Sequence, residues 1–240
     1  MSEKNTFLQN EGDVKFPMLR NLYDFYAPRC KSLEIWCFGL GHCGIESSLT
    51  ESLGCSVKIY DHREEAKERF ALCETALRTH KAPQDAPSWL KDLSKKWILP
   101  NKLTFHTSLP ASYTGTRVLN NGTTVQFEKT VMERVDFVKI DYNELNSSIV
   151  YDILTQGYRP GLILIHWNEN PDNFSHTMLA AGHLQNSGYT LLEVSDDWFL
   201  YHFNDQCVYE STSWARSDVP NPLLHEFKQN VIENFLSHGK

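Results

Sequence analysis

Glycines follow one apolar stretch closely. The segment CFGLGHCG spans residues 37–44 and places glycines at 39, 41 and 44. Glycine has no Cβ atom, so it permits unusual backbone dihedrals and the close approach of a ligand. A helix that starts after such a turn offers free N–H groups. Asp61 lies roughly twenty residues further on, where an acid can accept hydrogen bonds from the two hydroxyls of a nucleotide ribose. The simpler roles are a ligand-free turn and a helix N-cap.

Two further polar groups end apolar runs. Asp141 ends VDFVKID, and His166 lies at the end of GLILIHW. A carboxylate or an imidazole within hydrogen-bond reach can take the proton of a reacting hydroxyl. Both residues also have structural alternatives, a helix cap for Asp141 and a hydrogen-bonded core position for His166. The residues that follow these run ends could bind an acceptor through polar groups or an aromatic face: Asn143, Trp167, Asn168 and Glu169.

Metal and disulfide chemistry are less favoured. Asp141, His166 and Glu169 have ligand atoms that suit a metal, but no adjacent acidic pair accompanies them, so we predict no metal site. The six cysteines are scattered and form no CxxC pair, which argues against a disulfide framework or a zinc ribbon. Cys37, Cys55 and Cys73 are expected to pack as small apolar side chains.

Alternating elements must position these groups. Short apolar runs predict strands at 33–38, 56–60, 102–106, 135–141 and 161–167. Helical spacing predicts helices at 45–53, 64–78, within 83–97, at 145–155, 174–187 and 223–236. Asn121-Gly122 between two extended runs predicts a hairpin, and the runs 189–195 and 198–204 predict a closing antiparallel pair around Asp196-Asp197.

This order predicts an α/β fold. Strand, turn, helix and strand alternate, which favours a doubly wound, mostly parallel seven-stranded sheet with a C-terminal antiparallel hairpin. We expect a single domain, with an N-terminal extension at 1–32, a Rossmann-like core at 33–204 and a C-terminal tail and helix at 205–240. Ligands in open sheets of this kind bind beyond the carboxyl ends of the strands, where the segments GLGHCG, DHR, DYNE and HWNEN all fall.

From about residue 33 to 204, apart from an insertion at 83–97, the chain resembles the FkbM-type methyltransferases that use S-adenosylmethionine. The resemblance rests on VDFVKIDYNELNSSIVYDIL, RPGLILIHWNEN and GYTLLEVSDDWFLYHF in that order. It implies a class I methyltransferase fold and O-methyl transfer to a hydroxyl of a sugar, a glycan or a small metabolite. The implied cofactor-binding residues are Phe38, Gly39, Leu40, Gly41, Gly44, Asp61, His62, Arg63, Thr107 and Asp141, and the implied catalytic residues are Asp141, His166 and Asn143.

The chain departs from this family after Asp141. The family has two carboxylates and a glycine where this chain has Asn143, Asn146 and Glu144. A different acceptor is one explanation, and a catalytically degenerate binding module that keeps the fold is the alternative. The spacing GxGxxG also admits NAD, so an NAD-dependent oxidoreductase remains a third, less favoured hypothesis.

Composition restricts the partners. The 240-residue chain has a net charge of -7 and a pI of about 5.8, with no basic stripe, so we expect no nucleic-acid partner. No apolar run approaches the ~20 residues that span a bilayer, and the polar N-terminus lacks a signal pattern, so we expect no membrane partner and a cytoplasmic location. No heptad or exposed apolar stripe indicates an oligomer.

Overall fold

The computed structural model describes residues 33–119, 122–130, 135–142, 145–167, 174–195 and 198–203. Within these residues the main feature is a seven-stranded sheet in the order β3-β2-β1-β7-β8-β10-β9. Its strands, in chain order, are β1 (Glu34–Phe38), β2 (Ser56–Tyr60), β3 (Leu103–His106), β7 (Phe137–Ile140), β8 (Leu162–His166), β9 (Tyr189–Ser195) and β10 (Trp198–Phe203).

The strand directions confirm the predicted doubly wound sheet. Strands β3, β2, β1, β7 and β8 run parallel, and β10 runs antiparallel to both β8 and β9. The chain builds outward from β1 to β3 on one side and from β7 onward on the other, so the switch point lies between β1 and β7. The crevice beyond the carboxyl ends of these two strands is where open α/β sheets bind ligands.

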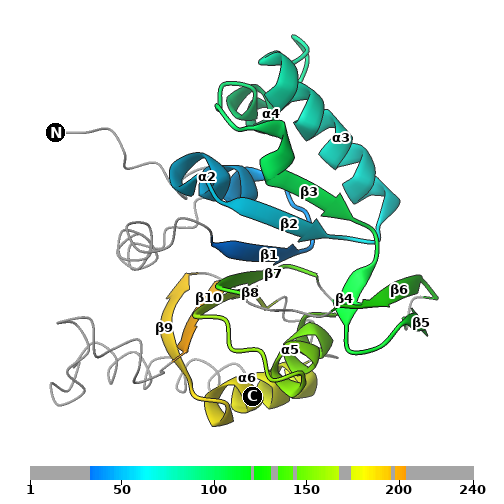
Figure 1. Ribbon diagram of the computed structural model, residues 1–240, viewed down its shortest axis with the longest axis vertical. Helices are drawn as coiled ribbons and strands as arrows, with labels where there is room; N and C mark the ends of the chain where they lie inside the picture. The colour runs from blue at the N-terminus through cyan, green and yellow to red at the C-terminus, as the bar shows by residue number, and fades with distance from the viewer. Residues whose placement is uncertain are drawn as a thin grey trace, which may run out of the picture. The chain divides into compact units, whose positions relative to one another are not determined.

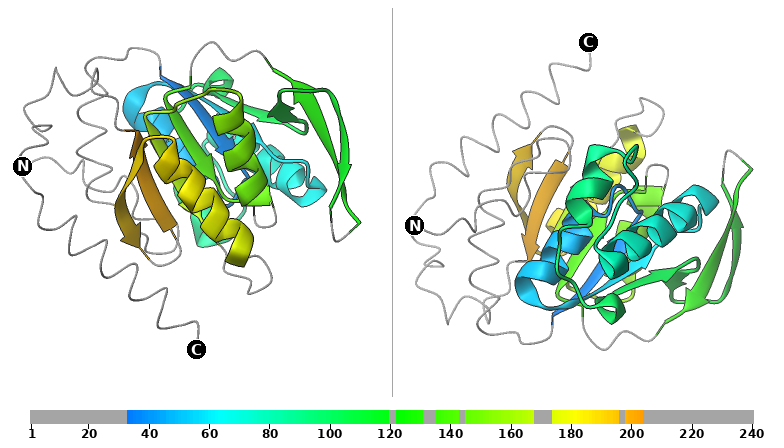
Figure 2. Two further views of the ribbon diagram at one scale, coloured as in Figure 1. Left: turned by 90° about the horizontal axis from the view of Figure 1, so that it is seen from below. Right: turned by 90° about the horizontal axis from the view of Figure 1, so that it is seen from above.

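Helices cover both faces of the sheet (Figures 1 and 2). One face carries α2 (Gly44–Leu53), α3 (Glu64–Thr79) and α4 (Ser88–Leu93), and the other carries α5 (Asn146–Thr155) and α6 (Phe174–Asn186). The core on the first face is aliphatic and small, which lets the helices lie close to the strands: Ile35, Cys37, Leu49, Val57, Ile59, Cys73 and Ala76. The cysteines predicted to pack as apolar side chains, Cys37, Cys55 and Cys73, are all buried.

A small second sheet leaves the main one after β3 (Figure 2). It consists of β4 (Leu109–Ala111), β5 (Gly115–Val118) and β6 (Thr124–Lys129) in the order β4-β6-β5. Strands β5 and β6 form the antiparallel hairpin predicted from Asn-Gly, and Gly122 has a φ of +83°. Strand β4 was not predicted, because its three residues are too short to show a period.

The sequence overestimated one helix. The segment 83–97 forms only the six-residue α4, which starts after Pro87. A 3₁₀ turn, Pro100–Lys102, precedes β3. The predicted helix 223–236, the extension 1–32 and the tail 205–240 lie outside the described residues. No helix in the described part of the chain is long and apolar enough to cross a membrane.

Candidate functional site

The first glycine of the turn is needed by the chain itself. Gly39 has a φ of +84°, and a Cβ atom added there would lie 1.9 Å from the carbonyl oxygen of Asp141. The N–H of Gly39 donates to the carbonyl of Tyr60 at 2.9 Å. The turn thus lies directly against the ends of β7 and β2, and no residue with a side chain fits at position 39 without displacing the backbone.

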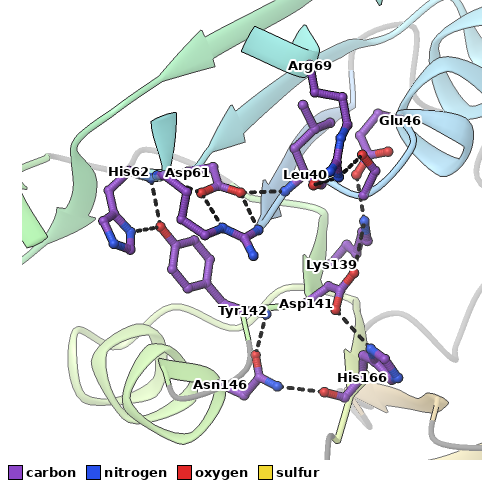
Figure 3. A network of polar contacts seen from close by, with 12 residues as sticks. Leu40, Glu46, Asp61, His62, Arg69, Lys139, Asp141, Tyr142, Asn146 and His166 are labelled. Carbon is purple, nitrogen blue, oxygen red and sulfur yellow. Dashed lines mark hydrogen bonds and ion pairs between the residues drawn. The ribbon is translucent and has the colours of Figure 1, made fainter. Parts of the chain in front are cut away.

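Asp61 is completely buried, and both its oxygens accept hydrogen bonds (Figure 3). The backbone N–H of Leu40 donates to Oδ2 at 2.8 Å, which ties the glycine turn to the end of β2. The Arg63 guanidinium donates to the two oxygens from Nε at 2.9 Å and Nη2 at 2.6 Å, and the Arg63 N–H donates to Oδ1 at 3.0 Å. Because a carboxylate has about four acceptor positions, the chain's own donors satisfy Asp61 in this structure.

Tyr142 joins the end of β7 to the end of β2. Its ring is buried and stacks on His62 with centroids 5.5 Å apart, and its hydroxyl accepts the His62 backbone N–H at 2.8 Å. The Tyr142 hydroxyl also contacts Nδ1 of His62, and the Arg63 guanidinium lies 5.3 Å from the Tyr142 ring centroid. Burial raises the pKa of Tyr142 and lowers the pKa of His62, so both are neutral at pH 7.

Asp141 and His166, predicted as catalytic residues, lie together. Asp141 Oδ1 is 2.9 Å from His166 Nδ1, and the two side chains are each a little over one fifth exposed. The His166 ring stacks on Trp198 of β10 with centroids 4.7 Å apart and planes within 6°. Burial opposes the ionisation of Asp141. The hydrogen bond from His166 and the charges of Lys139 and Arg63 outweigh it, so the pKa of Asp141 lies below its usual value.

A buried ion pair extends this cluster into the sheet. The Lys139 ammonium on β7 donates to Glu46 Oε1 on α2 at 2.8 Å, and neither side chain is exposed. The same ammonium lies 3.9 Å from Asp141 Oδ2. The sequence reasoning missed both residues. The signals available were a lysine inside an apolar strand, two positions before Asp141, and a glutamate in the first turn of α2.

Asn146, in the first turn of α5, accepts one hydrogen bond and donates another. Its Oδ1 accepts the backbone N–H of Tyr142 at 2.7 Å, and its Nδ2 donates to the carbonyl of His166 at 2.6 Å. It thereby fixes the distance between the segments that follow β7 and β8. An ionised carboxylate has no donor, so it could not make the second bond. The amide of Asn146 therefore has a structural role, which does not depend on catalysis.

The other predicted site residues are placed as follows. Phe38 is buried between aromatic rings, with Tyr60 stacked on it at 5.4 Å. Trp167 is buried and donates from Nε1 to the hydroxyl of Tyr201 at 3.2 Å, so its ring packs in the core. Thr107 is exposed after β3. The Arg69 guanidinium donates to the carbonyl of Gly41 at 3.1 Å. Gly44 starts α2, while Asn143, Asn168 and Glu169 lie outside the described residues.

The structure therefore brings together the ends of β1, β2, β7 and β8 around one set of polar groups. Two carboxylates, Asp61 and Asp141, flank the glycine turn, and an imidazole is bonded to the second of them. Among the described residues, no histidine, cysteine, aspartate or glutamate side chains gather in threes as metal ligands would. Carboxylates and an imidazole can bind hydroxyls, balance a cation and move a proton.

No family model and no curated protein sequence matches the chain. Its fold is similar to that of solved structures with low sequence identity. Ribosomal protein L11 methylase from Lactobacillus delbrueckii subsp. bulgaricus is 12% identical over 78% of this chain and 78% of its own, with a TM-score of 0.40. The methyltransferase domain of METTL16 is 13% identical over 80% and 70%, with a TM-score of 0.43.

A third similar structure is named for a different reaction. The precorrin 8W decarboxylase of Methanobacterium thermoautotrophicum is 12% identical over 78% of this chain and 89% of its own, with a TM-score of 0.40. These similarities concern the fold alone, and at such TM-scores they carry no argument about the reaction. One fold can carry different reactions, so the function depends on the residues of the site.

Proposed function

We propose that the protein is an S-adenosylmethionine-dependent methyltransferase. One observation carries the proposal: acids stand at the ends of two strands around the switch point of a sheet whose strand β10 is reversed between β8 and β9. Asp61 follows β2 and Asp141 follows β7, with the Gly39 turn between them. The switch point is where a doubly wound sheet binds a nucleotide, and an acid after the second strand suits the ribose hydroxyls.

The residues present fit an adenosyl cofactor. S-adenosylmethionine supplies a methyl group bound to a sulfonium cation. The buried cluster of Glu46, Lys139 and Asp141 has two carboxylates and one ammonium, so one negative charge is in excess beside the turn. This charge favours a cation. Asp61 can accept ribose hydroxyls once Arg63 leaves it, and the Arg63 side chain is 35% exposed, so solvent can receive it.

His166 is the better candidate for the general base. The lowered pKa of Asp141 makes it a weak base, whereas its hydrogen bond to His166 Nδ1 favours the tautomer with the lone pair on Nε2. When bound, S-adenosylmethionine would supply the methyl group, and its sulfur would take back the electron pair of the sulfur–methyl bond as the acceptor oxygen replaces it. The acceptor proton passes to His166 Nε2, and Asp141 stabilises the imidazolium that results.

The acceptor follows from the sequence resemblance and not from the fold. We propose a hydroxyl of a sugar, a glycan or a small metabolite. Asn143, Asn168 and Glu169, which follow Asp141 and His166 in the sequence, are the polar residues proposed to bind it. The acidic composition supports a small-molecule acceptor over a nucleic acid. A cytoplasmic location is proposed as well. The Trp167 ring is buried, so it would have to leave the core to offer its aromatic face to an acceptor.

The binding-module alternative also has an observation in its favour. Arg63 and Leu40 already satisfy Asp61, and the Tyr142 ring spans from the end of β7 to the end of β2. A chain that keeps these contacts permanently would retain the fold without turnover. The NAD hypothesis has no added support, since it rests on the glycine spacing alone.

Thermal unfolding with S-adenosylhomocysteine tests the proposal. A ligand that binds only the folded state stabilises it by about 2.7 kcal/mol at a hundredfold excess over Kd. We expect the melting temperature to rise with S-adenosylhomocysteine and to stay constant with NAD. A rise followed by methyl transfer to a sugar in an acceptor screen supports the enzyme. Binding without turnover favours the module, and no rise at millimolar ligand contradicts both adenosyl hypotheses.

A further inference from the structure

The buried pair of Lys139 and Glu46 calls for an explanation other than stability. Both side chains are fully buried, and they meet at 2.8 Å between β7 and α2. Removing two charges from water costs about as much as, or more than, their attraction returns, and well-packed apolar side chains of the same volume often serve a fold as well. A buried ion pair is therefore weak evidence for a stabilising role.

The position of Lys139 points toward the Asp141–His166 pair. Successive residues of a strand face opposite sides, so Lys139 and Asp141, two positions apart, share the face that α2 covers. The Lys139 ammonium lies 3.9 Å from Asp141 Oδ2, whereas His166 bonds the other carboxylate oxygen, Oδ1. It also lies 5.8 Å from the ring centroid of Trp198, which is the ring stacked on His166.

Glu46 connects this cluster to the glycine turn. It lies in the first turn of α2, which begins at Gly44, and it holds the Lys139 ammonium from the side opposite Asp141. Lysine side chains have many rotamers, so a lysine that must point at one carboxylate needs a second partner to fix it. The titratable and charged groups around Asp141 come from four elements: Lys139 on β7, His166 on β8, Arg63 after β2 and Glu46 on α2.

We propose that Lys139, held in place by Glu46, is a positioning residue that keeps Asp141 ionised and bonded to Nδ1 of His166. The proposal rests on the function proposed above, in which His166 is the base. Without the ammonium, Asp141 would retain a proton more readily and would donate to His166 rather than accept from it. His166 would then lose the tautomer that leaves Nε2 able to take the acceptor proton.

The test uses Lys139→Met, which keeps an unbranched side chain only one atom shorter and removes the charge. A second variant, Glu46→Gln with Lys139→Met, removes both charges and avoids a lone buried carboxylate, so one of the two can be studied if the other unfolds. Lys58→Met is the matched control, because Lys58 on β2, separated from β7 by β1, pairs with Glu34 at a partly exposed site. Circular dichroism checks that each variant folds.

Two measurements on the protein without ligand give the answer. Carboxyl carbon NMR follows the titration of Asp141, and nitrogen NMR reports the tautomer of His166. We expect Lys139→Met and the double variant to raise the pKa of Asp141 by about one pH unit or more, as the loss of an opposite charge at this distance implies. We also expect the fraction of His166 with the proton on Nδ1 to fall, while Lys58→Met leaves both quantities unchanged.

The outcomes separate this proposal from the proposed function. If the titration of Asp141 and the tautomer of His166 in the folded Lys139 variants match those in Lys58→Met, the positioning role is overturned, whatever the protein catalyses. If they change as expected but the wild type binds no S-adenosylhomocysteine, the positioning role stands and the methyltransferase proposal fails. Where turnover is found, we expect the variants to lower kcat and shift its pH profile with little effect on cofactor affinity.

Discussion

Arg63 makes the contacts on Asp61 that a ribose would make. The guanidinium reaches both carboxylate oxygens, and such charge-assisted bidentate bonds are among the stronger ones in proteins. A ligand that uses Asp61 must first break them. Arg63 and such a ligand thus compete for the same carboxylate, and the affinity measured for the ligand includes the free energy of displacing Arg63.

Removal of this competitor should therefore strengthen binding. We expect Arg63→Met to lower the Kd of S-adenosylhomocysteine about tenfold, equivalent to ~1.4 kcal/mol. Isothermal calorimetry measures the change. Arg78→Met is the control, because Arg78 makes an exposed ion pair with Glu74 on α3, far along the sequence from the turn. A weaker affinity in Arg63→Met would mean that Arg63 contacts the ligand instead of excluding it.

At the scale of elements, the site depends on how closely the β1 turn approaches the end of β7. Gly39 has its φ in the left-handed region, and its missing side chain leaves room for the Asp141 carbonyl. Gly54, at the end of α2, has a similar φ of +62°, but a Cβ atom there would meet nothing within 4 Å. A substitution at Gly54 therefore tests backbone conformation alone, whereas one at Gly39 also tests the contact with Asp141.

Alanine substitutions at these positions should differ in cost. We expect Gly54→Ala to lower the free energy of unfolding by about 1 kcal/mol, the strain of a left-handed alanine. Gly39→Ala should lower it by about 3 kcal/mol or more, since the backbone must also move. Urea denaturation gives both values. Equal losses in the two variants would show that the contact with Asp141 does not constrain the turn.

The sequence predicted most elements because their signals are local. The apolar runs, the glycine turn and Asn121-Gly122 each lie within a short window, and Asp61 and Asp141 could be identified because they end predicted strands. Lys139 and Glu46 lie 93 residues apart, and no local pattern relates them. The bonds of Arg63 to Asp61 and the path of Tyr142 depend on side-chain rotamers, which strand and helix periodicity does not encode.

At the scale of the whole molecule, buried carboxylates make stability depend on pH in opposite directions. The pKa of Asp141 is lowered in the fold, so its ionised form stabilises the protein above the unfolded pKa of about 4, and this is lost as the pH falls through the folded pKa. Burial raises the pKa of Asp152 on α5 despite the nearby Arg117, so its ionised form destabilises the fold at neutral pH.

Two matched aspartate-to-asparagine variants should show these signs. We expect Asp141→Asn to lose less stability than the wild type as the pH falls below about 4, because it lacks the group that must be protonated there. Asp152→Asn should be more stable than the wild type at pH 7, and its advantage should shrink on acidification. Urea midpoints across the pH range measure both. Curves parallel to the wild type in both variants would contradict these signs.

The strand order also bears on when the protein becomes able to bind. In the sheet, the half from β3 to β1 and the half from β7 to β9 meet only along β1 and β7, where Ile35 pairs with Phe137 about a hundred residues away. Gly39, Asp61 and Asp141 come together only when this seam closes. A chain in which both halves are formed but β1 and β7 are not paired would have most of its secondary structure and no site. Binding of a ligand at this site and the pairing of β1 with β7 would therefore stabilise each other.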